Sequence, residues 1–505
     1  MNERASLMAP GVAGSRSRPS NAIAGWLGAN ARQRMAAAMV ALVGLMLVSM
    51  VTVSFQGVDA AAESEQGDVV RQILLGGLFI VFLLVAGPTP PALGSGSRRA
   101  GGLPLPFSMI IFLGYCLISV SWAIAPLVSL RRLGLTVIVI WMIFRAVGEL
   151  GYGRTVKLIR WTLLGVMVAN FISLLIPGVG LQPDTPGGDP GVVGDWRGLQ
   201  PHKNIGGAVC AFTMIFFLFD RRSISTYILV PVLMACALFL YFSHSKTSEG
   251  VLLVALLSGW LIRPYSADYR ALLAPALVIG AGLALQLGTL YLGDLSVMMA
   301  DPSALSGRSQ IWPLLLTYAS EHPLKGAGFG SFWQIGDDSP IYSFTDGWIA
   351  QYAGHGHNGF LDLLVTLGVP GLLLGVLALI VWPLMRLLLS LSIPKGRRSL
   401  LLALLIFCIG HNVTETSLMD RAAVVQIFLV LAIALIFEQS SLSDGAHHRL
   451  KRRWLAITRR RSRSDMVGSG RTGPGKTAVP RRAGGHMTMR PPARTDGRSR
   501  AHARK

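Results

Sequence analysis

The chain has 505 residues, of which 52% are hydrophobic and only 14% are charged, whereas typical soluble domains are about 25% charged. Four cysteines in so long a chain exclude a disulfide-stabilised scaffold. The net charge of +21 would suggest nucleic-acid binding in a soluble protein, but the apolar surplus predicts a polytopic membrane protein, so the charge has to be interpreted by location.

Basic segments flank the apolar part of the chain. Residues 1–34 form a basic N-terminal arm that is too long and too polar for a simple signal peptide. Residues 439–505 hold 18 Lys and Arg against three acids, with too few apolar residues for a core, so we expect a mostly disordered tail. This tail either contacts anionic lipids at the cytoplasmic face or only fixes the topology; we do not expect it to bind nucleic acid.

Residues 35–438 predict an all-α, polytopic bundle of about 12 transmembrane helices. A spanning helix needs roughly 20 apolar residues. Segments that meet this requirement lie near 35–55, 70–87, 104–124, 127–146, 156–176, 203–219, 224–242, 247–263, 270–291, 358–385, 398–412 and 421–438.

The connecting segments alternate in charge. One side carries Arg98-Arg99, Arg145 with Arg154, Arg221-Arg222, Arg263 with Arg270, and Lys395 with Arg397-Arg398. The other side carries Glu63, Glu65, Asp68, Asp184, Asp189, Asp195, Asp294, Asp301, Asp337, Asp338 and Asp346. The positive-inside rule places the first set in the cytoplasm, and an even number of spans then places both termini there.

A long outer loop, about residues 292–356, is predicted between the ninth and tenth helices. Loops of this length are usually functional or disordered, and this one is rich in aromatic residues, which predicts a folded segment. Residues 308–319 look helical, with Ser306 as a possible cap. The aromatic side chains either form an interfacial belt or stack on sugars. They are Trp312, Phe329, Phe332, Trp333, Tyr342, Phe344, Trp348 and Tyr352.

Polar clusters on the outer side are candidates for function, because ionisable groups are costly near a membrane. Arg197, His202, Lys203 and Asn204 open the sixth span, where the helix dipole favours an anion. Snorkelling of the cations to the interface is the alternative.

A second cluster opens the eighth span, and a third opens the predicted loop helix. Lys246 lies among hydroxyl residues, and an ion pair with Glu249 is its alternative role. Arg308 can offer a bidentate fork to phosphate oxygens, although an arginine in a first helical turn is often only solvated.

The fourth cluster runs from His355 to Asp362 and leads into the tenth span. His357 is a candidate general base, and Asn358 and Asp362, one helical turn apart, are expected to orient it; helix capping by the histidine is the alternative. No carboxylate–histidine spacing accompanies the two histidines, so no metal is expected. A further outer cluster, residues 411–416, looks like pocket lining without a specific role.

Together these motifs resemble the O-antigen ligase and Wzy-type polysaccharide polymerase superfamily, in particular its ExoQ-like exopolysaccharide polymerisation branch. The resemblance covers roughly residues 197–420. It rests on the order and spacing of the groups at 197–204, Ser-Lys at 245–246, Gly-Arg-Ser-Gln-Ile-Trp at 307–312, His-Pro-Leu-Lys-Gly-Ala-Gly-Phe-Gly at 322–330 and His-Asn-Gly-Phe-Leu at 357–361.

The resemblance implies a GT-C-like helical bundle in the bacterial inner membrane with a large periplasmic loop. It implies a glycosyltransferase that takes glycans from undecaprenyl diphosphate without a metal, cofactor or nucleotide sugar. By the same resemblance His357 is the base, while Arg308, Lys246 and Arg197 hold the diphosphate. Ligases often have Arg where this chain has Lys246, which offers a point charge instead of a fork and fits a polymerase better.

The resemblance also implies membrane lipids and a lipid-linked oligosaccharide as partners, together with co-polymerase and export proteins. A ligase that transfers the glycan to another acceptor is the nearest alternative. A transporter of lipid-linked sugars would show repeated half-length segments, and no convincing internal repeat is present. A structural subunit of a synthesis complex is a third alternative.

Overall fold

The computed structural model describes residues 21–51, 69–86, 105–184, 190–220, 224–272, 307–345 and 354–440, with a few isolated positions between them. The first 20 residues, the basic tail and most of 270–306 lie outside this part of the chain. So do Ser306, Trp348 and Tyr352 from the predicted outer loop.

The described residues form helices and no strand, which confirms the predicted all-α class. Within the described ranges, six helices are long and apolar enough to cross a membrane, as in a multi-pass membrane protein. The longer helices are α1 Asn21–Met50, α3 Val69–Ala86, α4 Phe107–Ser119, α5 Pro126–Ser173, α6 Lys203–Phe219, α7 Thr226–Ser243, α8 Lys246–Leu261, α11 Arg308–Glu321, α13 Gly359–Val376, α14 Trp382–Leu389, α15 Lys395–Thr414 and a last helix, Val424–Ser440. The shorter ones are η1 Val120–Trp122, η2 Pro190–Val192, η4 Ala267–Leu272, η6 Pro340–Ser343 and the π-helical η7 Leu377–Val381.

Described helices lie at each predicted spanning range except 270–291, which falls mostly outside the described residues. The total of twelve spans therefore stays a prediction. At the start of the chain, α1 begins at Asn21, so the helix extends into the segment expected to be a polar arm. The helix expected at 308–319 is present as α11, and Gly307 stands at its N-cap.

Two glycines break long helices where the backbone takes a left-handed conformation. Gly151, with φ 71°, divides α5 into the two segments expected at 127–146 and 156–176. Gly368, with φ 67°, divides α13, so the first turns of that helix are separated from residues 369–389. At 1.5 Å per residue the latter stretch is about 30 Å long, enough to span a bilayer by itself. The 28-residue segment predicted at 358–385 therefore combines a helix of spanning length with the shorter helix that precedes the break.

The helices pack around two apolar cores. The larger lies within the bundle, where Phe212 stacks on Phe428 with ring centroids 3.9 Å apart. The smaller core joins α11 and the start of α13 to residues 322–345, which we call the outer segment after their predicted location. It includes Leu315, Phe332 and Val365. The second core means that the aromatic outer segment is folded, as its composition predicts.

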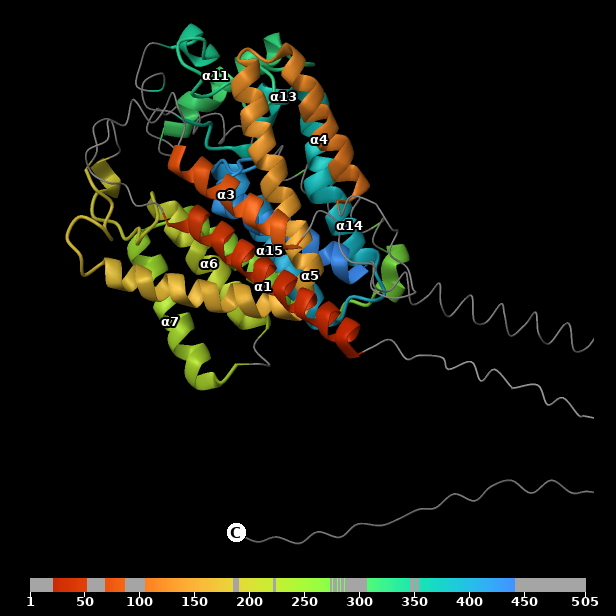
Figure 1. The fold of residues 1–505 in the computed structure, drawn as a ribbon. Helices are drawn as coiled ribbons and strands as arrows, with labels where there is room; N and C mark the ends of the chain where they lie inside the picture. The colour runs from red at the N-terminus through yellow and green to blue at the C-terminus, as the bar shows by residue number, and fades with distance from the viewer. Residues whose placement is uncertain are drawn as a thin grey trace, which may run out of the picture. The chain divides into compact units, whose positions relative to one another are not determined.

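The outer segment docks on the turn that joins α4 to α5, at the same end of the bundle as α11 and the start of α13 (Figure 1). Ile124 N donates to Ala327 O at 3.1 Å, and Phe329 N donates to Ser119 Oγ at 3.1 Å. Arg132 donates to the carbonyls of Gly330, Trp333 and Gln334. The glycine-rich motif at 322–330 thus fixes the outer segment to the bundle.

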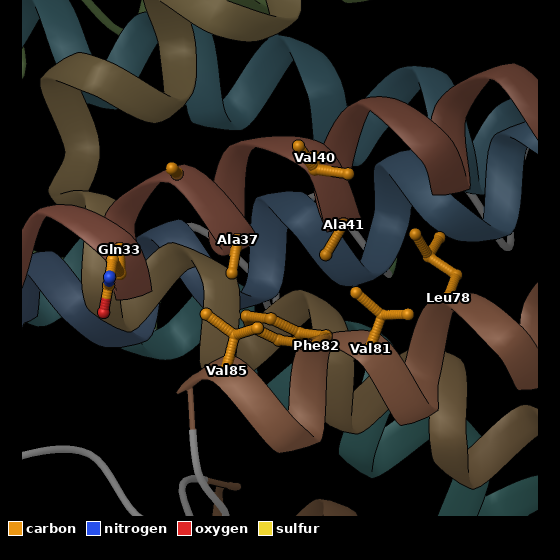
Figure 2. A pocket seen from close by; sticks show the side chains of 9 residues that line it. Gln33, Ala37, Val40, Ala41, Leu78, Val81, Phe82 and Val85 are labelled. Carbon is orange, nitrogen blue, oxygen red and sulfur yellow. The ribbon is translucent and has the colours of Figure 1, made fainter. Parts of the chain in front are cut away.

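The groove between α1 and α3 is a second feature of the bundle, shown in Figure 2. Ala37 and Ala41 of α1 face Val81, Phe82 and Val85 of α3. Gln33 is the one polar residue among those that line it. The groove therefore offers apolar contact and no chemical group suited to act on a sugar.

Candidate active site

The carboxylate of Glu415, just after α15, joins three of the predicted site residues. Arg308 Nη2 donates to Glu415 Oε1 at 2.7 Å, and Asn204 Nδ2 donates to the same oxygen at 2.6 Å. The other oxygen, Oε2, lies 3.2 Å from Nδ1 of His357. One carboxylate thus brings together residues from α6, α11 and the segment before α13, which are far apart in the sequence.

Glu415 is ionised in this setting. Burial by itself would raise the pKa of the carboxyl, but the hydrogen bond with His357 and the charges of His357 and Arg308 lower it to about 2. A negative charge at the C-terminal end of α15 opposes the helix dipole, so these neighbours also offset that cost. An ionised carboxylate only accepts hydrogen bonds, which means that Nδ1 of His357 carries the shared proton.

Nε2 of His357 is left for chemistry. With Nδ1 protonated, a neutral imidazole has its lone pair on Nε2, and this atom has no partner among the described residues. About a third of the side chain, 35%, is exposed, compared with 11% for Glu415. His357 also has φ 50°, a left-handed conformation that is uncommon for a residue with a side chain and that clusters at functional sites. The arrangement is that of a histidine base oriented by a carboxylate.

Four helix N-termini converge on the same place. Asn204 is the second residue of α6, and Arg308 is the first residue of α11. Thr247, the second residue of α8, accepts a hydrogen bond at 3.0 Å from Thr414. At the start of α13, Gly359 N donates to Glu415 O. Each N-terminus carries a partial positive charge, so this end of the bundle attracts anions beyond the charge of its side chains.

Lys246 is the first residue of α8 and lies next to Thr247. Its side chain is exposed, and within the described ranges no ion pair links it to Glu249. Its neighbour Thr247 contacts Thr414, whose carbonyl also accepts from Arg308 Nε at 2.9 Å, so the start of α8 lies at the same end of the bundle as Arg308.

Arg197 and Lys203 belong to a neighbouring group rather than to the Glu415 contacts. Arg197 donates through Nε to Val179 O at 3.1 Å, and burial lowers its pKa. Lys203 Nζ pairs with Asp195 at 2.5 Å, and Asp195 also contacts His244 Nδ1 at 2.6 Å. These contacts fix the loop before α6 to the turn between α7 and α8, and so position the N-terminus from which Lys246 projects.

Asn358 and Asp362 shape the chain around His357 without touching its ring. Asn358 caps α13 by accepting from Phe360 N and Leu361 N. Asp362 accepts from Gly356 N and from Trp333 Nε1 at 2.8 Å. These contacts fix the backbone on either side of His357, whereas the ring itself contacts Glu415.

Two further histidines stand beside the site. His202 caps α6 by accepting from Asn204 N at 3.2 Å, and burial lowers its pKa, partly opposed by Glu415. His355 accepts from His357 N at 3.3 Å, and burial together with His357 lowers its pKa. Both are therefore neutral supports at pH 7. In the described ranges no three His, Cys, Asp or Glu side chains are placed to hold a metal ion.

Glu415 received no role in the sequence analysis. The signal was a single acid at the end of an apolar span, on the side where the other polar clusters lie. Its partners stand 58, 107 and 211 residues away along the chain, so no local spacing could reveal the contact.

Comparison with known proteins gives two matches. The family described as O-antigen ligase matches residues 209–376. Over 123 residues the chain is 29% identical to the exopolysaccharide production protein ExoQ of Rhizobium meliloti, covering 24% of this chain and 27% of that protein. The chain therefore matches about a quarter of the length of this curated relative.

These matches confirm the resemblance to O-antigen ligases and ExoQ-like proteins that the motifs indicated. The family match includes Lys246, Arg308 and His357. Asn204 and Glu415 lie outside it, so their part in the site rests on the geometry alone.

Proposed function

We propose that the protein polymerises oligosaccharide repeat units carried on undecaprenyl diphosphate into exopolysaccharide, at the periplasmic face of the bacterial inner membrane. The observation that carries the proposal is the His357–Glu415 pair at a meeting point of helix N-termini and cations. The similarity to ExoQ supports exopolysaccharide as the product class.

The reaction is a displacement at the anomeric carbon. A hydroxyl of the acceptor glycan forms the new C–O bond and gives its proton to Nε2 of His357. The bond between the anomeric carbon and the diphosphate oxygen breaks, and its electron pair leaves with undecaprenyl diphosphate. Glu415 holds the ring and stabilises the imidazolium that forms. A single displacement inverts the anomeric centre.

The cations at the site serve the leaving group. Negative charge grows on the diphosphate as the bond breaks, and fixed positive groups stabilise it where it develops. Arg308 and Lys246, with the N-termini of α8 and α11, supply that charge. Arg197, in the loop before α6, is the third proposed diphosphate-binding residue. No metal or nucleotide is required in this scheme.

A ligase would use the same chemistry on a different acceptor, and a transporter would move the donor without any bond change. Reconstitution in liposomes separates these functions. Chain growth from lipid-linked repeat units alone supports the polymerase; transfer to another acceptor alone contradicts it; movement without new glycosidic bonds indicates a transporter. A polysaccharide co-polymerase and export proteins are the expected partners of the polymerase in cells.

The test of the base is His357→Ala. The variant is expected to lose chain growth by at least about a hundredfold while it still inserts and folds. His322→Ala is the matched control, because His322 is exposed and stacks on Tyr318, away from Glu415; it should keep most of its activity. Normal high-molecular-weight polysaccharide from His357→Ala would contradict the assignment.

A further inference from the structure

Three arginines gather at the outer end of α5, apart from the Glu415 contacts. Arg131 and Arg132 lie in the second turn of α5, and Arg421 lies just before the last helix. Thr136 Oγ1 lies 3.4 Å from Met419 O, so the turn that carries Arg421 rests on the start of α5. Met419 itself has φ 63°, a left-handed conformation that directs the chain into this turn.

This cluster has more positive charge than its surroundings neutralise. Arg421 and Arg131 repel the Arg132 guanidinium, and Asp420 is the acid that attracts it. The Arg132 contacts are to neutral carbonyls, and Asp420 uses Oδ1 to cap Ala422 N at 3.0 Å. Among the described residues Arg131 and Arg421 have no hydrogen-bond or ion-pair partner.

Two other arginines of α5 pair with acids. Arg145 reaches Glu149 at 2.5 Å, and Arg160 reaches Asp220 at 2.7 Å. Arg131 and Arg421, with no such partner among the described residues and with Arg131 exposed, are available to an anion from outside the fold.

The cluster is connected to the site through a short chain of contacts. Arg132 donates to Trp333 O at 2.8 Å, and Trp333 Nε1 donates to Asp362 at 2.8 Å. Asp362 in turn holds Gly356 N, the residue before His357. Trp333 and Asp362 thus lie between the arginines and His357. The fold can therefore hold one anionic group at the arginines and another beside His357.

We propose that Arg131, Arg132 and Arg421 bind an anionic group of the acceptor substrate, a phosphate or a carboxylate. This inference rests on the proposed function. In polymerisation the acceptor is itself lipid-linked, so it carries a diphosphate away from its reacting hydroxyl. In the proposed function Arg308 and Lys246 bind the donor diphosphate. The arginines at the outer end of α5 form a second cationic site, which binds the acceptor diphosphate.

The experiment measures acceptor and donor dependence separately, with the full-length protein in nanodiscs. The first acceptor, called the diphosphate acceptor, is a repeat unit on a short prenyl chain. Its diphosphate is joined to the sugar through a carbon–phosphorus bond that cannot be displaced, so it cannot act as donor. A second acceptor is the same oligosaccharide as a methyl glycoside without diphosphate. The variants are Arg421→Glu and the exposed Arg131→Glu, with Arg421→Lys as the conservative change and Lys325→Glu as control.

Both charge reversals are expected to raise the half-saturating acceptor concentration on the order of tenfold or more, and to leave that of the donor unchanged. Arg421→Lys should keep most of the affinity. Lys325, whose ammonium lies 6.0 Å from the ring centroid of Trp122, is a cation of the same outer segment, and its reversal should have no effect. A penalty limited to the diphosphate acceptor identifies the diphosphate; a penalty with both acceptors identifies an acidic sugar.

Several results would overturn the inference. Unchanged acceptor dependence in both reversals would do so, as would equal shifts for donor and acceptor. An effect that appears with anionic phospholipids but vanishes in zwitterionic nanodiscs would assign the arginines to phospholipid head groups instead. If the unmodified protein shows no chain growth, the proposed function itself fails, which is distinct from growth that is insensitive to Arg421→Glu.

Discussion

At the scale of single residues, the histidine and the carboxylate are useful only as a pair. Glu415 keeps a proton on Nδ1 of His357 and so presents the lone pair of Nε2. The carboxylate is almost fully buried and stays ionised because Arg308 and His357 surround it. Removing its charge should therefore affect catalysis more than folding.

Glu415→Gln is the substitution that tests this. The amide is close in shape but cannot stabilise an imidazolium, so we expect chain growth to fall by at least about a hundredfold. Initial rates, beside a thermal unfolding curve, separate the loss of activity from any loss of folded protein.

A merely structural Glu415 would give a different result. The rate would then fall only in proportion to the loss of folded protein. Glu415→Asp, which retains the charge on a shorter side chain, should keep more activity per folded molecule than Glu415→Gln.

At the scale of elements, the outer segment is held to the bundle by close backbone contact. Gly328 has φ 87°, and a β-carbon there would lie 2.4 Å from Ala123 Cα. A β-carbon on Gly368, in the break of α13, would lie at a similarly short 2.6 Å from Leu324 O. Glycine at these positions permits both the left-handed backbone and the approach.

Gly328→Ala should therefore detach the segment from the turn between α4 and α5. We expect the free energy of unfolding to fall by on the order of 3 kcal/mol, measured by thermal unfolding in detergent. Gly336→Ala is the matched control, since Gly336 has φ 77° but open space around it, and about 1 kcal/mol is expected from its backbone alone. Equal losses in the two variants would show that the contact with Ala123 is unimportant.

At the scale of the whole described bundle, the polar groups from five regions meet at one end. The other end carries ion pairs such as Arg145–Glu149 and Arg160–Asp220. This separation agrees with the loop-charge pattern, by which we propose that the active end faces the periplasm and both termini face the cytoplasm.

Cysteine labelling tests that orientation. The four native cysteines are buried, so an introduced cysteine reports alone. Asp338→Cys, at an exposed position of the outer segment, should react in intact spheroplasts with a membrane-impermeant maleimide. Gly396→Cys, exposed at the start of α15, should react only after lysis. The reverse pattern would invert the topology.

Hydropathy predicted the helices well because burial in lipid demands long apolar runs. It could not predict the break within 358–385, because in the sequence Gly368 looks like any glycine that a helix tolerates. Only the structure shows that the backbone of Leu324 packs against it. The motifs identified His357, Arg308 and Asn204 as site residues. The contacts of Glu415 and the proximity of Arg132 to Arg421 depend on tertiary packing. The residues involved are far apart in the chain, so no sequence pattern could predict that they meet.

The long separations between Glu415 and its partners affect biogenesis. Membrane proteins are inserted from the N-terminus, so His357 and Arg308 reach the bilayer well before α15. Until α15 is inserted, the histidine lacks the carboxylate that selects its proton position, and the arginine lacks its anchor. If the proposed function is right, a chain terminated before α15 should therefore be inactive toward lipid-linked sugars, and activity should arise only once nearly all of the described helices have been inserted.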